Sequence, residues 1–165
     1  MIATKENTSL AHLTIEEVKK MTLRVVCRTI VLDQETARIL LVRNRGQDFW
    51  YAPGGGWDHA VESIKECVSR ETLEETGIQV HPVRLLYVQE FRPGNGDEHL
   101  ELFWFAFPTG TTKLGTIEDK HGIVEEARWF SRDELRELKV FPTRLKDRFW
   151  HEISSALTSP NAFLE

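Results

Sequence analysis

Residues 56–78 read GWDHAVESIKECVSRETLEETGI. From Glu62 to about Thr76 the stretch has neither Gly nor Pro and is rich in helix-forming residues, and Gly77 follows where a C-terminal helix cap belongs. These features predict a helix that ends at Gly77. Just upstream, Pro53 and three consecutive glycines cannot remain helical, so they predict a turn whose backbone groups are free to bind other groups.

The predicted helix carries carboxylates on the face that should meet the core. At 100° per residue, an apolar stripe begins at Ile64 and Val68. Within an arc of about 60° the same stripe continues through Glu71 and Glu75, with Glu74 beside it. Like charges at this spacing repel one another, and the dipole of the helix disfavours anions at its C-terminal end. Two interpretations follow: a solvated acidic face, or a site for Mg²⁺, whose preferred ligands are oxygen atoms.

The flanking sequence predicts a sheet domain. Residues 23–32 and 38–43 read as a strand hairpin, residues 78–91 and 99–107 as a pair of longer strands, and 128–130 as a brief strand. Capping boxes at Thr14–Glu17 and Ser131–Glu134 each predict a short helix, the first reaching about Lys20. Pro142 suits the first turn of a final helix that extends to about Leu157. The order is that of a mixed α+β domain.

The spacing within residues 56–78 resembles the signature of the Nudix hydrolase family. Gly56, Glu62 and then Arg-Glu-x-x-Glu-Glu-x-Gly from Arg70 to Gly77 stand at the fixed positions of that signature. The order of the surrounding elements is similar to the rest of the family's domain. The resemblance implies a Nudix-type α/β/α sandwich with a mixed β-sheet. It divides the chain into an N-terminal arm with a short helix (1–22), a Nudix domain (23–158) and a C-terminal tail (159–165).

The resemblance also implies roles for the signature residues. In enzymes of this family the glutamates that match Glu71, Glu74 and Glu75 bind Mg²⁺ or Mn²⁺, and the one that matches Glu71 is often the base that activates water. A glycine carbonyl before the helix usually completes the metal site. Gly55 is the matching position, but an apparent one-residue insertion in the loop leaves Gly54 and Gly56 as alternatives.

Supporting residues are implied in the same way. The arginine that matches Arg70 braces the preceding loop by pairing with a carboxylate there, for which Asp58 is the expected partner, and Glu62 fits a supporting role. Many members add a glutamate from the long loop after the signature. Here Glu118, Asp119 and Glu125 are the candidates, of which we prefer Glu118 as a metal ligand.

Four residues outside these positions are candidate substrate contacts. Arg43, Arg45 and Arg92 are predicted to contact phosphates, and Trp57, beside the glycine turn, to stack on a base. Each also has an ordinary interpretation, because a lone arginine in a loop is often only solvated and a large aromatic residue is often part of the core.

The implied function is Mg²⁺-dependent hydrolysis of a nucleoside diphosphate linked to another moiety, such as a nucleotide sugar, ADP-ribose or an NTP-like compound. The alternative is a Nudix-like nucleotide-sensing or interaction module without turnover. An isopentenyl diphosphate isomerase, which has the same fold, uses a reactive cysteine, whereas Cys27 on a predicted strand fits the core better. Substrate identity depends on loops outside the signature.

Composition limits the partners. The 165 residues include 21 Lys and Arg against 26 Asp and Glu, which gives a net charge of −5. Residues 56–78 hold six acidic and two basic side chains, a net of −4, so most of the imbalance lies in the signature. An acidic chain argues against long nucleic acid as a ligand but not against a small diphosphate, because a bound cation inverts the local charge.

No apolar run is long enough for a membrane span, and two cysteines 40 residues apart favour a reducing, cytoplasmic setting. The oligomeric state, a homodimer included, stays open.

Overall fold

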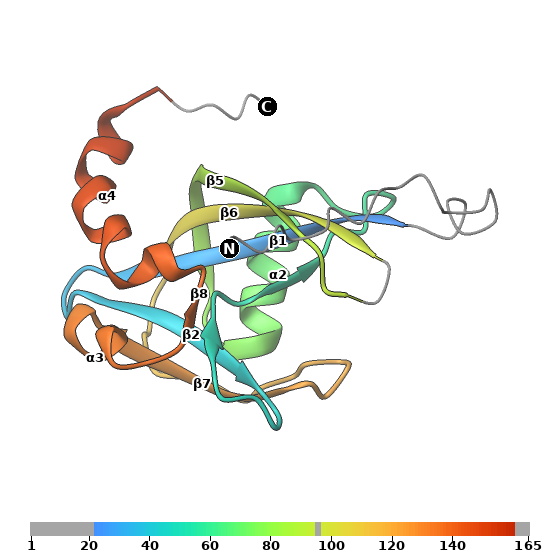
Figure 1. Cartoon of the computed structure of the whole chain (residues 1–165), viewed down its shortest axis with the longest axis horizontal. Helices are drawn as coiled ribbons and strands as arrows, with labels where there is room; N and C mark the ends of the chain where they lie inside the picture. The colour runs from blue at the N-terminus through green and yellow to red at the C-terminus, as the bar shows by residue number, and fades with distance from the viewer. Residues whose placement is uncertain (1–21, 95–96, 161–165) are drawn as a thin grey trace, which may run out of the picture.

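The computed structural model describes residues 22–94 and 97–160, and the helix predicted at 14–20 lies outside them (Figure 1). The strands are β1 (Leu23–Asp33), β2 (Arg38–Asn44), β3 (Trp50–Tyr51), β4 (Gly54–Gly56), β5 (Val80–Phe91), β6 (Glu98–Pro108), β7 (Val124–Ser131) and β8 (Val140–Phe141). The helical elements are α2 (Ile64–Thr76), α3 (Arg132–Arg136), the 3₁₀ helix η2 (Thr143–Lys146) and α4 (Arg148–Thr158). The predicted α+β class is confirmed.

The strands form a mixed sheet, as predicted. Its main order is β5-β6-β1-β2-β3-β8, while β4 pairs with β1 and β7 pairs with β2. The β1–β2 pair is antiparallel, which confirms the predicted hairpin, whereas β1 runs parallel to β6. The central strand β1 therefore contacts β2, β4 and β6, and the glycine turn is attached to the sheet as the short strand β4.

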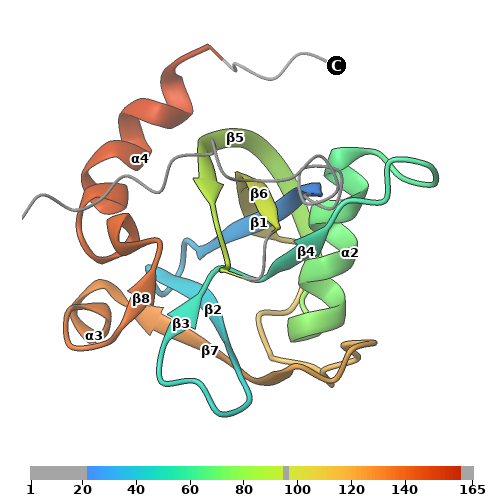
Figure 2. The same ribbon diagram turned by 45° about the vertical axis from the view of Figure 1, so that its right-hand side comes forward.

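Helices cover the sheet from two sides, as Figure 2 shows for α2 on one side and for α3 and α4 on the other. This arrangement follows from the alternation of side chains along each strand. Towards α2 the sheet presents a cluster that includes Cys27, Leu102 and Trp104, which pack against Cys67 and Val68. Towards α3 and α4 the neighbouring positions of the same strands pack against helix residues; this second cluster includes Ile30, Phe103, Phe105, Leu135, Phe149 and Ile153.

The helix α2 is fixed at both ends by its own sequence. Ser63 and Glu66 form a reciprocal capping box, so the helix begins at Ile64 and not at Glu62, where the absence of Gly and Pro had placed its start. Gly77 adopts a left-handed conformation (φ 70°) and its N–H donates to the carbonyl of Leu73, as predicted for a C-cap. Helix α2 thus ends one residue after Glu75.

The C-terminal part differs from the prediction in two places. Strand β7 is longer than residues 128–130, because it pairs with β2 along most of the length of that strand. Pro142 does not open the final helix: its carbonyl accepts a hydrogen bond from Leu145 three residues on, which closes a 3₁₀ turn, and α4 starts only at Arg148. The capping box predicted at Ser131 is present. Among the described residues, no helix combines the length and apolar character that a membrane span requires.

Candidate active site

The signature glutamates meet the glycine turn at the C-terminal half of α2. Glu75 is buried, with 8% of its surface exposed, and its Oε2 accepts a hydrogen bond of 2.9 Å from the backbone N–H of Gly54. The carboxylate of Glu71 lies against Gly55 so closely that a Cβ built on this glycine would stand 2.5 Å from Glu71 Oε2. The structure therefore brings two of the predicted metal ligands onto β4, and a side chain at position 55 would displace the carboxylate of Glu71.

The three candidate carbonyls of the turn differ in their surroundings. The Gly54 carbonyl accepts a hydrogen bond from Arg28, and the Gly56 carbonyl faces the thiol of Cys67, with 3.7 Å between oxygen and sulfur. The α-carbon of Gly55 faces the carboxylate of Glu71. Gly55 as the backbone ligand stays a prediction.

Arg70 braces the preceding loop through Glu62, and the predicted pairing with Asp58 is wrong. The guanidinium binds Glu62 through two nitrogens, with Nε–Oε2 at 2.8 Å and Nη2–Oε1 at 2.6 Å. This hydrogen bonding lowers the pKa of Glu62 and contributes to a raised pKa of Arg70. Asp58 instead accepts from the N–H of Ala60, a local turn contact that turns its carboxylate to its own loop.

This corrected pairing predicts a difference in stability between two conservative variants. Glu62→Gln should lower the free energy of unfolding by about 1–2 kcal/mol, because it removes the charge from a partly buried bidentate contact. Asp58→Asn should change it by less than about 0.5 kcal/mol, as an exposed position does. Urea unfolding of both variants without added metal measures the difference. A cost for Asp58→Asn as large as that for Glu62→Gln would contradict the assignment.

Two cations neutralise the remaining carboxylates. Arg70 Nη1 lies 2.7 Å from Glu71 Oε1 and 3.3 Å from Glu74 Oε2, and Lys120 Nζ lies 2.8 Å from Glu74 Oε1. Lys120 comes from the loop between β6 and β7. That loop is docked on the end of α2 by a 2.7 Å hydrogen bond from the N–H of Glu118 to the carbonyl of Glu74.

In the loop between β6 and β7, the predicted ligand Glu118 and its neighbour Asp119 have different surroundings. Glu118 is exposed and contributes its backbone N–H to the contact with α2. The carboxylate of Asp119 accepts hydrogen bonds from the N–H groups of His121 and Ile123 in the loop and of Val124, the first residue of β7, and its charge contributes to the raised pKa of Glu75. Asp119 thus organises the loop beside the carboxylates, while a role for Glu118 as a ligand stays a prediction.

The donor set suits a hard divalent cation. Glu75 has a pKa raised to about 8, chiefly by burial and also by the nearby charges of Glu71 and Asp119, while the Gly54 N–H and Arg28 oppose the shift. A bound cation stabilises the ionised form of a buried carboxylate that lies near other negative charges. Within residues 22–94 and 97–160, no three His, Cys, Asp or Glu side chains are yet arranged to hold a metal ion. Arg70 and Lys120 pair with carboxylate oxygens of Glu71 and Glu74 that a cation would use.

The four predicted substrate contacts lie on different elements. Arg43 pairs with Glu125 and Glu126, and its guanidinium lies 5.5 Å from the centre of the Trp50 ring. Glu125, one of the candidate metal ligands, is thus engaged in an ion pair with Arg43. Arg45 follows β2 and donates its backbone N–H to the carbonyl of Ile123.

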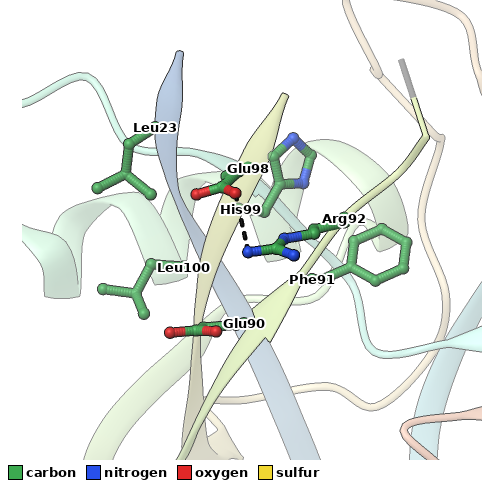
Figure 3. Close-up of a pocket in the computed structure, with 7 residues that line it drawn as sticks. All are labelled: Leu23, Glu90, Phe91, Arg92, Glu98, His99 and Leu100. Atoms are coloured by element: carbon green, nitrogen blue, oxygen red, sulfur yellow. Dashed lines mark ion pairs between the residues drawn. The ribbon is translucent and has the colours of Figure 1, made fainter. Parts of the chain in front are cut away.

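Trp57 lies in the loop before α2, and Arg92 directly follows β5. The Trp57 indole donates to the carbonyl of Glu62 at 2.8 Å and packs beside the α2 cluster, so it supports the loop. Arg92 pairs with Glu98 at 3.0 Å in a groove formed by β5, β6 and the start of β1 (Figure 3). The structure thus does not gather these four residues around the carboxylates.

Sequence reasoning missed two residues at the turn. Arg28 on β1 and Glu101 on β6 form an ion pair of 3.1 Å, and Arg28 also donates to the Gly54 carbonyl at 2.9 Å. The sequence does hold a signal: Arg28 is the charged residue within residues 25–32, Glu101 is the charged residue within residues 100–107, and their charges are opposite. Buried strands exclude charges unless these are paired, so this pattern could have indicated a contact.

Comparisons with known proteins agree with this geometry. A family model described as the NUDIX domain matches residues 22–149. The chain is 31% identical to the NAD-capped RNA hydrolase ndx-9 of Caenorhabditis elegans, over 82% of this chain and 38% of that protein. It is 32% identical to the 8-oxo-dGDP phosphatase NUDT18 of Danio rerio, over 71% of this chain and 36% of that protein. The chain thus spans under two fifths of the length of these curated relatives.

Solved structures with the same fold include a NUDIX hydrolase from Nitrosomonas europaea, with a TM-score of 0.63 and 25% identity over 87% of this chain and 97% of that one. The solution structure of the E. coli ORF135 protein also has a TM-score of 0.63, with 21% identity over 86% of this chain and 98% of that one. The match of the family model over most of the chain, which includes the glutamates of α2 and the glycine turn, shows that the chain belongs to the Nudix hydrolase family.

Proposed function

We propose that the chain is a Mg²⁺- or Mn²⁺-dependent pyrophosphohydrolase that cleaves a nucleoside diphosphate linked to another moiety. The observation that carries this proposal is the convergence of Glu71 and Glu75 on the glycine turn, with Glu75 buried against the Gly54 N–H and Glu74 linked to Glu71 through Arg70. Two relatives are named for NAD-capped RNA and 8-oxo-dGDP, and both compounds contain a diphosphate. Their names support the substrate class without selecting a substrate.

The residues that would hold the cation are Glu71, Glu74, Glu75 and the Gly55 carbonyl. A cation bound there supplies charge neutralisation to the diphosphate oxygens and to the leaving phosphate. Glu71 pairs with Arg70 through Oε1 and has its Oε2 towards the turn, whereas Glu74 pairs through both oxygens, so the Glu74 carboxylate would have to turn away from Arg70 or Lys120 to bind a cation. This movement leaves the bidentate contact of Arg70 with Glu62 in place, so the loop stays braced.

Three side chains have further roles: Glu71 takes up a proton, Glu75 holds the glycine turn and Lys120 attracts the substrate. Glu71, at the edge of the turn, accepts the proton of the attacking water as a general base. Glu75 holds the N–H of Gly54, which keeps the turn against α2. Lys120, once released from Glu74, carries its charge on a loop that is docked beside the site, where it attracts the phosphates of the substrate.

A substrate panel tests the proposal. ADP-ribose, a nucleotide sugar, a nucleoside triphosphate, 8-oxo-dGDP and a short NAD-capped RNA are incubated with Mg²⁺ or with EDTA, and products are identified by mass. We expect Mg²⁺-dependent cleavage of the phosphoric anhydride bond in at least one class, and none with EDTA. Nucleotide binding without any product would instead support the sensing or interaction module.

A further inference from the structure

A half-buried guanidinium contacts the glycine turn and takes part in no step described so far. Arg28 on β1 donates to Glu101 Oε1 on β6 (3.1 Å) and to the carbonyl of Gly54 on β4 (2.9 Å). It also lies 5.2 Å from the centre of the Tyr51 ring on β3. One side chain thus connects four strands of the sheet at the point where the turn meets it.

The partner of Arg28 is held more tightly than an ordinary surface carboxylate. The Glu101 side chain is 7% exposed, and its second oxygen accepts a hydrogen bond of 3.4 Å from Gln89 on β5. Removing two charges from water costs free energy that a buried ion pair often fails to recover, so such a pair is weak evidence of a purely stabilising role. The pair does, however, give the guanidinium a fixed position and direction.

That direction matters because both backbone groups of Gly54 are held by charged side chains. Its N–H donates to Glu75 on α2 and its carbonyl accepts from Arg28 on β1. Gly54 has a φ of 145°, a conformation that other residues rarely adopt, and the two contacts hold the peptide in that conformation. The carbonyl fixed by Arg28 belongs to the peptide that leads into Gly55, the candidate backbone ligand.

We propose that Arg28, oriented by Glu101, is a positioning residue that fixes the Gly54–Gly55 peptide for metal binding and turnover. This inference rests on the proposed function. It assigns to Arg28 no contact with the substrate, so its loss should act on metal affinity and on kcat and leave KM nearly unchanged. Groups that orient metal ligands typically contribute about 10- to 100-fold to metal affinity or activity.

The test combines Mn²⁺ binding in the absence of substrate, followed by electron paramagnetic resonance, with steady-state kinetics on the substrate found in the panel. Arg28→Gln should weaken Mn²⁺ binding and lower kcat by about tenfold each, with KM within about twofold of the wild type. Arg28→Lys keeps the charge and should recover part of both losses. Glu101→Gln, which retains the acceptor but not the charge, should show a smaller loss of the same kind.

Arg148→Gln is the matched control, because it breaks an exposed ion pair with Glu152 on α4 and should leave every readout unchanged. Circular dichroism and melting temperatures establish that each variant is folded. If Arg28→Gln does not fold, Arg28→Lys and Glu101→Gln carry the test.

Wild-type Mn²⁺ affinity and kcat in folded Arg28→Gln would overturn the inference, and so would a rise in KM alone, which would make Arg28 a substrate contact. If the wild-type protein turns over its substrate, either of these results leaves the proposed function intact. A wild-type protein that cleaves no member of the panel would instead count against the proposed function.

Discussion

Replacing Glu75 by Gln is expected to lower kcat by about a thousandfold, since a divalent cation contributes several kcal/mol and each 1.4 kcal/mol changes the rate about tenfold. Glu75 is the most buried of the three signature glutamates and lies where the turn meets α2. A neutral amide retains an acceptor for the Gly54 N–H but offers a cation a much weaker ligand. The effect should therefore fall on metal binding and turnover and not on the fold.

The measurement pairs kcat at saturating Mg²⁺ with the melting temperature of the metal-free protein. We expect the melting temperature of Glu75→Gln to equal or exceed that of the wild type, because the substitution removes a carboxylate whose charge is disfavoured by burial. Glu35→Gln, in the exposed turn between β1 and β2, controls for the loss of one negative charge. Full activity in Glu75→Gln would remove Glu75 from the metal site.

Local patterns predicted the part of the site that one helix contains. The limits of α2 depend on a capping serine, a run of helix-forming residues and a left-handed glycine, all of which act over a few residues. The arc on which Glu71 and Glu75 lie follows from helical geometry alone. The same locality explains the one error at its start, because the capping box at Ser63 outweighs the helix propensity of Glu62.

Contacts that depend on the path of a loop could not be predicted in this way. Asp58 and Glu62 are both within reach of Arg70 along the chain, and only the folded loop shows that Asp58 turns to Ala60. Arg28 and Glu101 are 73 residues apart, and their contact requires the parallel pairing of β1 with β6. Long-range strand pairing leaves little trace in a single sequence.

Replacing Glu71 by Gln is expected to lower kcat by about a hundredfold or more while KM changes by less than about threefold, because a general base contributes about 10²–10⁴ to the rate. Glu71 lies against Gly55 and pairs with Arg70 at 2.7 Å in the structure. A glutamine keeps the volume and one acceptor at this position, yet it cannot take a proton. An interaction that is used only in the transition state should lower kcat and kcat/KM together.

Glu118→Gln provides the contrast, because Glu118 is an exposed residue of the docked loop and was the predicted additional ligand. If Glu71 is the base, pre-steady-state measurements should place the loss in Glu71→Gln at the chemical step, and Glu118→Gln should retain most of the kcat. An unchanged kcat in Glu71→Gln together with a large loss in Glu118→Gln would move the base to the loop between β6 and β7. The α2 carboxylates would then serve metal binding alone, and the docking of that loop through the Glu74 carbonyl would become the feature that sets the catalytic geometry.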